Sequence, residues 1–146
     1  AAWLSASFLA RLLPYVVLGP LGGAIADRFD RRTLMVGLSV VRGVLFVAMA
    51  AIVLADGSRL AVVALLTLNA AGGAVFEPAR AAAIPQLVPE RDLAAANATE
   101  QGLSQLSWFV GPAVGALLLA VVDPGVVLAI DAATFFLTAA MLAHVG

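Results

Sequence analysis

The sequence predicts an all-α integral membrane protein, folded as an antiparallel bundle of transmembrane helices. Two observations lead to this fold class. The 146 residues are 63% apolar and 12% charged, whereas soluble domains are roughly 45–50% apolar and 25% charged. The apolar residues also lie in long runs that short polar or Pro/Gly segments interrupt. A hydrocarbon core about 30 Å thick requires about 20 apolar residues per helix, which matches the length of these runs.

Five spans are predicted within one transmembrane domain, residues 1–146, and they cover residues 2–26, 33–55, 60–83, 93–121 and 125–145. The segments that separate them read DRFDRR, DGSR, PQLVPERD and VDP. Short connectors between rigid helices make each helix antiparallel to the one before it. Because the number of spans is odd, we expect a further helix before residue 1 and more of the chain after residue 146.

Arginine is distributed unevenly between the two ends of the predicted bundle. The first and third connectors, 27–32 and 84–92, share one end and carry most of the cations, which are Arg28, Arg31, Arg32 and Arg91, with Arg80 just inside the third span. The connectors at the other end contain only Arg59. Positively charged short loops stay in the cytoplasm, so the first and third connectors are predicted to be cytoplasmic. Trp3 then lies near the outer interface, where indole rings are favoured.

Small residues spaced four apart suggest where helices touch, because they let backbones approach closely in lipid. Gly19 and Gly23 form one such pair, and Gly111 and Gly115 form another around Pro112. Glycine is also common in membrane helices, so these pairs predict packing only. Prolines within the spans remove backbone donors and predict bends, at Pro14, Pro78 and Pro112.

Ionisable residues inside the spans are the candidates for function, and they are Arg11, Arg42, Glu77, Arg80, Glu100 and Asp131. Each charge near the bilayer centre costs about 2.5 to 3.5 kcal/mol on insertion scales. Such residues usually face a bundle interior and mark a substrate or ion pathway, so an interior polar cavity is predicted. Counting at about 1.5 Å per residue places Arg11 and Arg42 near mid-depth. Asp131 falls in the outer half, and the remaining three fall towards the cytoplasm.

The spacing of these charges suggests different roles for the acids. Glu77 and Arg80 are three residues apart on one helix face, where they can neutralise each other. Glu100 and Asp131 have no opposite charge three or four residues away. An unpaired carboxylate in a membrane interior can take up a proton, so these two are the candidates for proton coupling. The alternative is that either acid pairs with Arg11 or Arg42 across the bundle, which the sequence leaves open.

Other function classes find little support in the residues. The chain has no cysteine and one histidine, His144, so no metal site and no other cofactor are expected. The net charge of −1 gives no basic surface for nucleic acid. DDxxD, GxSxG and lysine-ending phosphate loops are all absent from the sequence. The chain is therefore not expected to be an enzyme.

Two motifs resemble those of a known family. Residues 23–32, GAIADRFDRR, resemble the GxxxD(R/K)xG(R/K)(R/K) signature between helices two and three of the major facilitator superfamily. Asp30 stands where that signature has a second glycine, which supports a tight turn. Residues 107–116, SWFVGPAVGA, resemble the gxxxGPxxGG motif of helix five in exporters of that superfamily. Ser107 and Ala116 replace glycines there, and Gly111, Pro112 and Gly115 match.

The segment between these motifs is similar to one branch of that superfamily. Residues 76–80 read FEPAR, residues 84–89 read IPQLVP, and Ala96 and Asn97 follow. This pattern resembles the branch that includes enterobactin exporters and macrolide efflux proteins. The resemblance implies that the five runs are helices two to six of a twelve-helix transporter, within an incomplete amino-terminal six-helix half.

The resemblance also implies how such a protein works. Two six-helix halves rock about a central site, and a latch loop holds them in the outward-facing state. On this resemblance the latch loop comprises Gly23, Asp27, Arg28, Arg31 and Arg32. For its arginines, a simpler role is as topology signals and contacts to anionic lipid.

The function predicted from the sequence is proton-coupled efflux of a small molecule, such as a drug or a siderophore, across a bacterial inner membrane. Its expected partners are the lipid bilayer, the substrate, protons and the missing carboxy-terminal half, with no nucleic acid. Uptake by the same superfamily is one alternative, since only the motif at Gly111 and Pro112 favours export. A non-transporting membrane scaffold or sensor is another, suggested by the small-residue faces.

Overall fold

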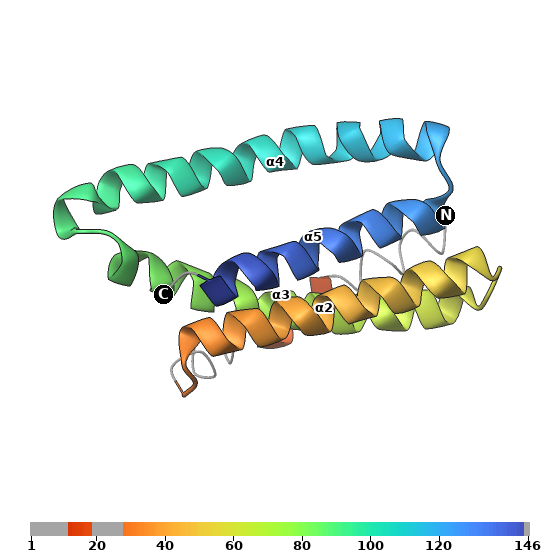
Figure 1. Ribbon diagram of the computed structural model, residues 1–146, viewed down its shortest axis with the longest axis horizontal. Helices are drawn as coiled ribbons and strands as arrows, with labels where there is room; N and C mark the ends of the chain where they lie inside the picture. Colours follow the sequence, from red (N-terminus) through yellow and green to blue (C-terminus); the bar gives the residue numbers. More distant parts are fainter. Residues whose placement is uncertain (1–11, 19–27, 145–146) are drawn as a thin grey trace.

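A computed structural model describes residues 12–18 and 28–144 of the chain (Figure 1). Its described part is almost entirely helical, and no strand occurs in it. Four helices in this part are long and apolar enough to cross a membrane. They are α2 (Arg31–Leu54), α3 (Arg59–Leu87), α4 (Leu93–Val121) and α5 (Pro124–His144). The predicted all-α membrane fold class is confirmed.

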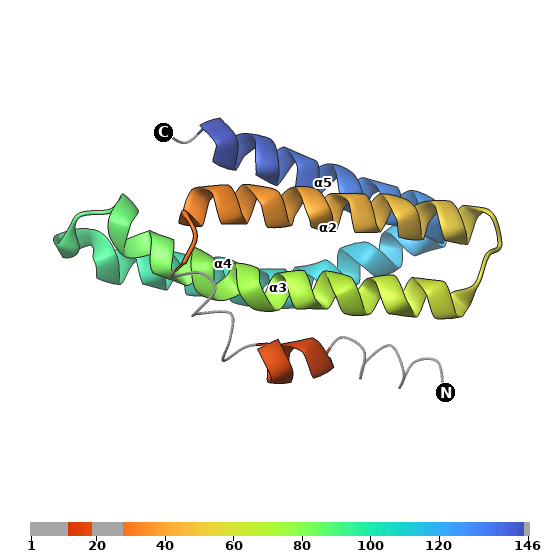
Figure 2. The ribbon, with the colours of Figure 1, turned by 90° about the horizontal axis from the view of Figure 1, so that it is seen from below.

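Helix α2 is the centre of the bundle. It packs along α5 on one side and along α3 on the other, as Figure 2 shows. Helix α4 differs, because it has few contacts with α3 and α5 and none of its residues is buried. In Figure 1 it runs apart from the other helices along its middle. The described core is therefore a three-helix packing of α2, α3 and α5, with α4 attached loosely.

The helices alternate in direction, as the short connectors predicted. The start of α2, the link from α3 to α4 and the end of α5 gather at one end of the molecule (Figure 1). The link from α2 to α3 and the link from α4 to α5 lie at the opposite end. Of the predicted span 2–26, residues 12–18 are helical and the remainder lies outside the described residues.

Helix α2 begins with a side-chain cap at Asp30. The Asp30 carboxylate accepts hydrogen bonds from Thr33 N at 2.8 Å and from Thr33 Oγ1 at 2.7 Å. Aspartate is among the preferred residues at this position because its oxygen satisfies a free backbone N–H of the first turn. The φ angle of Asp30 is −57°, which any residue adopts, so no glycine is needed here. Arg31 and Arg32, which the sequence analysis assigned to the connector 27–32, therefore form the first turn of α2.

The cap predicts how Asp30 affects stability with pH. The backbone hydrogen bond from Thr33, followed by its hydroxyl and the nearby Arg32, holds the pKa of the Asp30 carboxyl below its ordinary value. A lowered folded-state pKa stabilises the protein above about pH 4 and ceases to do so as the pH falls through that lowered pKa. We expect Asp30→Ala to lower the melting temperature of the whole protein at pH 7, and Asp30→Gly to lower it less.

Thermal melting in detergent at a series of pH values measures this effect. Glu90→Ala serves as the control, because Glu90 is an exposed acid in the next connector on the same end. An equal loss for Asp30→Ala and Glu90→Ala would show that the cap does not contribute.

Helix α3 begins at Arg59, where Ser58 Oγ accepts a hydrogen bond from Ala61 N at 3.4 Å. It continues to Leu87, four residues past the predicted end of the span at 83. Pro78 and Pro85 both lie within this helix, since membrane helices tolerate proline when neighbouring groups satisfy the freed carbonyls. The helix ends at Val88, whose extended backbone (φ −128°, ψ 147°) is the conformation favoured before a proline. The predicted connector 84–92 is correspondingly shorter.

A single 3-10 turn, η1 (Glu90–Asp92), leads into α4, whose bounds coincide with the predicted run 93–121. Helix α5 begins at Pro124, where the missing N–H costs nothing because first-turn donors have no partner within the helix. The Asp123 carboxylate accepts a hydrogen bond from Gly125 N at 2.8 Å and caps this end.

Candidate functional site

Two arginines tie the start of α2 to the ends of two other helices. Arg31 Nη1 donates to the carbonyl oxygen of Ala82 in α3 at 2.7 Å. Arg32 Nε donates to the carbonyl oxygen of Leu142 at 3.0 Å, and its Nη2 donates to that of Ala143, both in the last turn of α5. The last carbonyls of α5 lack partners within the helix and carry partial negative charge, which favours the Arg32 guanidinium there. These arginines thus position helix ends as well as adding positive charge to this side of the bundle.

The rest of the predicted latch loop is only partly described. Arg28 is exposed, and Gly23 and Asp27 lie outside the described residues. The latch function therefore stays a prediction.

Arg42 lies at the middle of α2, between α3 and α5. Its Nε donates to Asn69 Oδ1 in α3 at 3.1 Å. Its guanidinium carbon lies 4.4 Å from the centre of the Phe135 ring in α5 and 5.9 Å from that of Phe76 in α3. An arginine over an aromatic ring at such distances is attracted by the ring quadrupole. Arg42, predicted near mid-depth, is therefore held among three helices.

Two glycines of α3 make room for this arrangement. A side chain at Gly72 would place its Cβ 3.2 Å from Arg42 Cγ, and one at Gly73 would collide with the Tyr15 hydroxyl. Glycine is thus required for the close approach of the Arg42 stem and of segment 12–18 to α3. The predicted cavity residue Arg11 lies outside the described residues.

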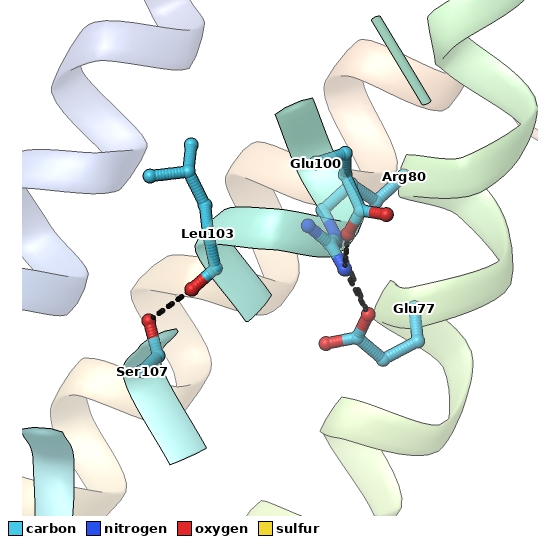
Figure 3. A network of polar contacts seen from close by, with 5 residues as sticks. All are labelled: Glu77, Arg80, Glu100, Leu103 and Ser107. Carbon is cyan, nitrogen blue, oxygen red and sulfur yellow. Dashed lines mark hydrogen bonds and ion pairs between the residues drawn. The ribbon is translucent and has the colours of Figure 1, made fainter. Parts of the chain in front are cut away.

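A cluster of three charges connects α3 to α4 (Figure 3). Arg80 Nη2 lies 2.8 Å from Glu77 Oε2 on its own helix and 2.7 Å from Glu100 Oε1 on α4. Arg80 Nε also donates to Glu77 Oε2, at 3.2 Å. The Glu77–Arg80 pairing suggested by their spacing is present. Glu100, expected to lack a partner or to pair with Arg11 or Arg42, instead pairs with Arg80, because its partner comes from a neighbouring helix.

Asp131 is placed differently from Glu100. It is exposed on α5, and its carboxylate forms no ion pair or hydrogen bond with any described residue. Its backbone carbonyl accepts a hydrogen bond from Thr134 Oγ1 at 2.7 Å, and the Thr134 carbonyl accepts one from Thr138 Oγ1 at 2.8 Å. Asp131, Thr134 and Thr138 therefore form a polar stripe along one face of α5.

The glycine-proline motif of α4 has no packing partner in the described part of the chain. The helix continues through Pro112, and side chains built at Gly111 and Gly115 would meet nothing within 4 Å. Ser107, at the first position of the motif, donates its hydroxyl to the carbonyl oxygen of Leu103 at 2.8 Å. Any role of Gly111, Pro112 and Gly115 in packing stays a prediction.

Sequence analysis missed several residues around Arg42, namely Asn69, Phe76, Phe135 and Tyr15. Asn69 carried a usable signal, because it is an amide within an apolar run directly before AAGG. The aromatic residues carried none, since aromatic side chains are common in membrane spans. Across residues 12–18 and 28–144, no group of three or more His, Asp or Glu side chains is placed to hold a metal ion.

Four long apolar helices, each able by length and composition to cross a membrane and joined by short connectors, indicate a multi-pass membrane protein. The sequence model described as Major Facilitator Superfamily matches residues 1–145. The chain belongs to this superfamily of membrane transporters.

Several bacterial relatives are similar to the chain. Macrolide efflux protein A of Enterococcus faecalis is 36% identical over 140 residues, which cover 88% of this chain and 40% of the relative. Macrolide efflux protein A of Streptococcus pyogenes is 34% identical, covering 88% of this chain and 32% of the relative. A putative bacilysin exporter of Bacillus subtilis is 28% identical, covering 98% and 36% respectively. The chain thus spans well under half the length of these relatives. No solved structure matches it.

Proposed function

We propose that the whole protein exports a small molecule across a bacterial plasma membrane by proton-driven alternating access. The observation that carries this proposal is the similarity of most of the chain to proteins named for macrolide efflux and bacilysin export. Because the relatives are much longer than the chain, a carboxy-terminal half completes the transporter in this proposal. A macrolide antibiotic is the substrate to test first.

The proposed orientation places the arginine-rich end of the bundle in the cytoplasm. Arg28, Arg31, Arg32 and Arg91 lie in or beside the connectors at this end, whereas the opposite end has Arg59. The positive-inside rule supports this orientation. The connectors 27–32 and 84–92 are then cytoplasmic, and the latch loop lies where it would contact the other half.

The proposed proton carriers are Glu100 and Asp131, because proton-driven export requires an acid that is exposed to each side of the membrane in turn. Arg42, Arg11, Glu77 and Arg80 are the other proposed cavity residues. The cavity role of Arg42 is supported by its place between three helices at mid-depth.

We expect the double variant Glu100→Gln/Asp131→Asn to abolish substrate-dependent proton flux. Everted membrane vesicles containing the whole protein would be energised to an acidic interior, and a macrolide would be added outside. A fluorescent pH probe then reports proton release, and radiolabelled macrolide reports accumulation inside the vesicles. Glu90→Gln, an exposed acid outside the proposed cavity, is the matched control.

Each readout tests a separate part of the proposal. Undiminished proton flux in the double variant would exclude these two acids as carriers. Accumulation that persists without a proton gradient would contradict proton coupling. Expulsion of a preloaded macrolide from these everted vesicles would indicate uptake in the cell.

A further inference from the structure

One side of α4 faces the rest of the bundle through a short row of residues. The residues of its first half that are partly covered are Leu93, Ala96, Glu100 and Ser104. Spacings of three and four place them on one face of the helix. Glu100 is therefore directed at α3, and its ion pair with Arg80 is the one polar side-chain contact between α3 and α4 in the described part of the chain.

Arg80 holds two carboxylates that differ in how they are attached. Glu77 is on the same helix, one turn away, so its contact with Arg80 does not depend on the position of α4. Glu100 is on α4 and shares the nitrogen Nη2 with Glu77. If α4 moves away, Arg80 keeps a carboxylate partner, and only Glu100 loses one. Separation therefore avoids leaving an unpaired cation in the membrane.

The other charges near this cluster follow an alternating order. Arg42 on α2 lies over the ring of Phe76, the residue before Glu77 in α3. The charges of Arg42, Glu77, Arg80 and Glu100 therefore alternate as positive, negative, positive and negative across three helices. Glu100 is the end of this series. Arg91 and Asp92, in the turn before α4, pair with each other at 3.5 Å. No charged side chain of α5 forms an ion pair with the cluster within residues 28–144.

We propose that Glu100 is a proton-binding residue whose protonation is linked to separation of α4 from α3. Arg80 is the positioning residue: it pairs with Glu100 while the helices are together and keeps its ion pair with Glu77 when they separate. When the ion pair opens, a Glu100 carboxylate oxygen takes a proton from water and becomes a neutral acid. A neutral acid is favoured over an unpaired carboxylate in a medium of low polarity. This inference rests on the proposed proton-coupled transport, to which it adds the movement of α4 and the positioning role of Arg80.

Distances between spin labels measure the movement without any substrate. In a cysteine-free version of the whole protein in lipid nanodiscs, labels at the exposed positions Leu87 on α3 and Leu106 on α4 report their separation. We expect the distance to lengthen as the pH is lowered from about 7 to about 3, which spans the range in which glutamate carboxylates in proteins ordinarily titrate. Glu100→Gln should show the long distance at every pH.

Glu77→Gln separates this proposal from a purely structural ion pair. Without Glu77, Arg80 is available to Glu100 alone, so the transition should move to lower pH by about one unit. A structural cluster would instead be weakened by both substitutions, and Glu77→Gln would then resemble Glu100→Gln. Glu90→Gln should behave as the unmodified protein, and size-exclusion profiles show which variants are folded.

Two results would overturn the proposal: a distance that does not change with pH in the unmodified protein, or a Glu77→Gln transition that moves to higher pH. A pH-independent distance in a protein that does couple transport to protons would refute the link between Glu100 protonation and the movement of α4, and the proposed function would stand. A pH-dependent distance in a protein without proton-coupled transport removes the proposed function and keeps the link between Glu100 and α4.

Discussion

Replacing Gly43 by isoleucine is expected to lower the stability of the whole protein by about 2 kcal/mol or more, because overpacked cores typically lose about 1 to 3 kcal/mol. Gly43 is buried in α2. A Cβ at this position would lie 2.9 Å from Phe136 Cε1 and 3.0 Å from Cζ. Helices α2 and α5 form the most extensive contact between described helices. A branched side chain must therefore displace the Phe136 ring or separate the two helices.

Gly37→Ile is the matched control for this prediction. It makes the same change in the same helix, at a position where a side chain would meet nothing within 4 Å. Thermal unfolding in detergent should show a loss for Gly43→Ile and little change for Gly37→Ile. Equal losses would attribute the effect to the helix backbone or to membrane insertion, and the packing explanation would fail.

The fold was predictable from the sequence where a helix boundary depends on adjacent residues. The run 93–121 is limited by Asp92 before it and by the Asp123–Pro124 pair after it, and α4 has those bounds. The end of α3 was misplaced because Pro85 resembles a terminator in the sequence. The helix continues to Leu87, since the constraint that ends it is the extended conformation of Val88 before Pro89.

The candidate site was predictable only where its contacts are local. Helical spacing identified the pair Glu77 and Arg80, but it could not supply the partner of Glu100, which lies on another helix. Similarly, Arg32 reaches carbonyls of α5 that are 110 and 111 residues away in the sequence. Periodicity specifies which residues share a face. The packing of whole helices determines which neighbour that face meets.

Arg42→Ala is expected to lower stability by about 3 kcal/mol, as the sum of a cavity between three helices and an unpaired amide. The Arg42 stem fills the space beside Gly72, and its guanidinium lies against Phe135. The same substitution leaves Oδ1 of Asn69, a residue only 8% exposed, without its donor. Because Asn69 is buried, its oxygen has little access to water that could replace that donor. Arg59→Ala, at an exposed helix start, is the control and should change little.

Two further variants, Arg42→Met and the double variant Arg42→Met/Asn69→Leu, separate the contribution of packing from that of hydrogen bonding. Arg42→Met refills most of the space but still leaves the Asn69 amide unpaired, so its loss should be nearer about 1 kcal/mol. Adding Asn69→Leu removes that unpaired group, and replacing both polar partners by apolar groups of similar shape can be nearly neutral. Thermal unfolding of the three variants should therefore rank Arg42→Ala as least stable and the double variant as closest to the unmodified protein.

The opposite order would change the assignment of Arg42. If the double variant is less stable than Arg42→Met, Asn69 stabilises the protein through contacts other than its hydrogen bond to Arg42, and an unpaired amide does not explain the loss in Arg42→Met. If Arg42→Met is nearly as stable as the unmodified protein but fails in the macrolide assay, Arg42 is required for transport and not for the fold. A charged residue at mid-membrane that the fold does not need is explained best by a role in the cavity.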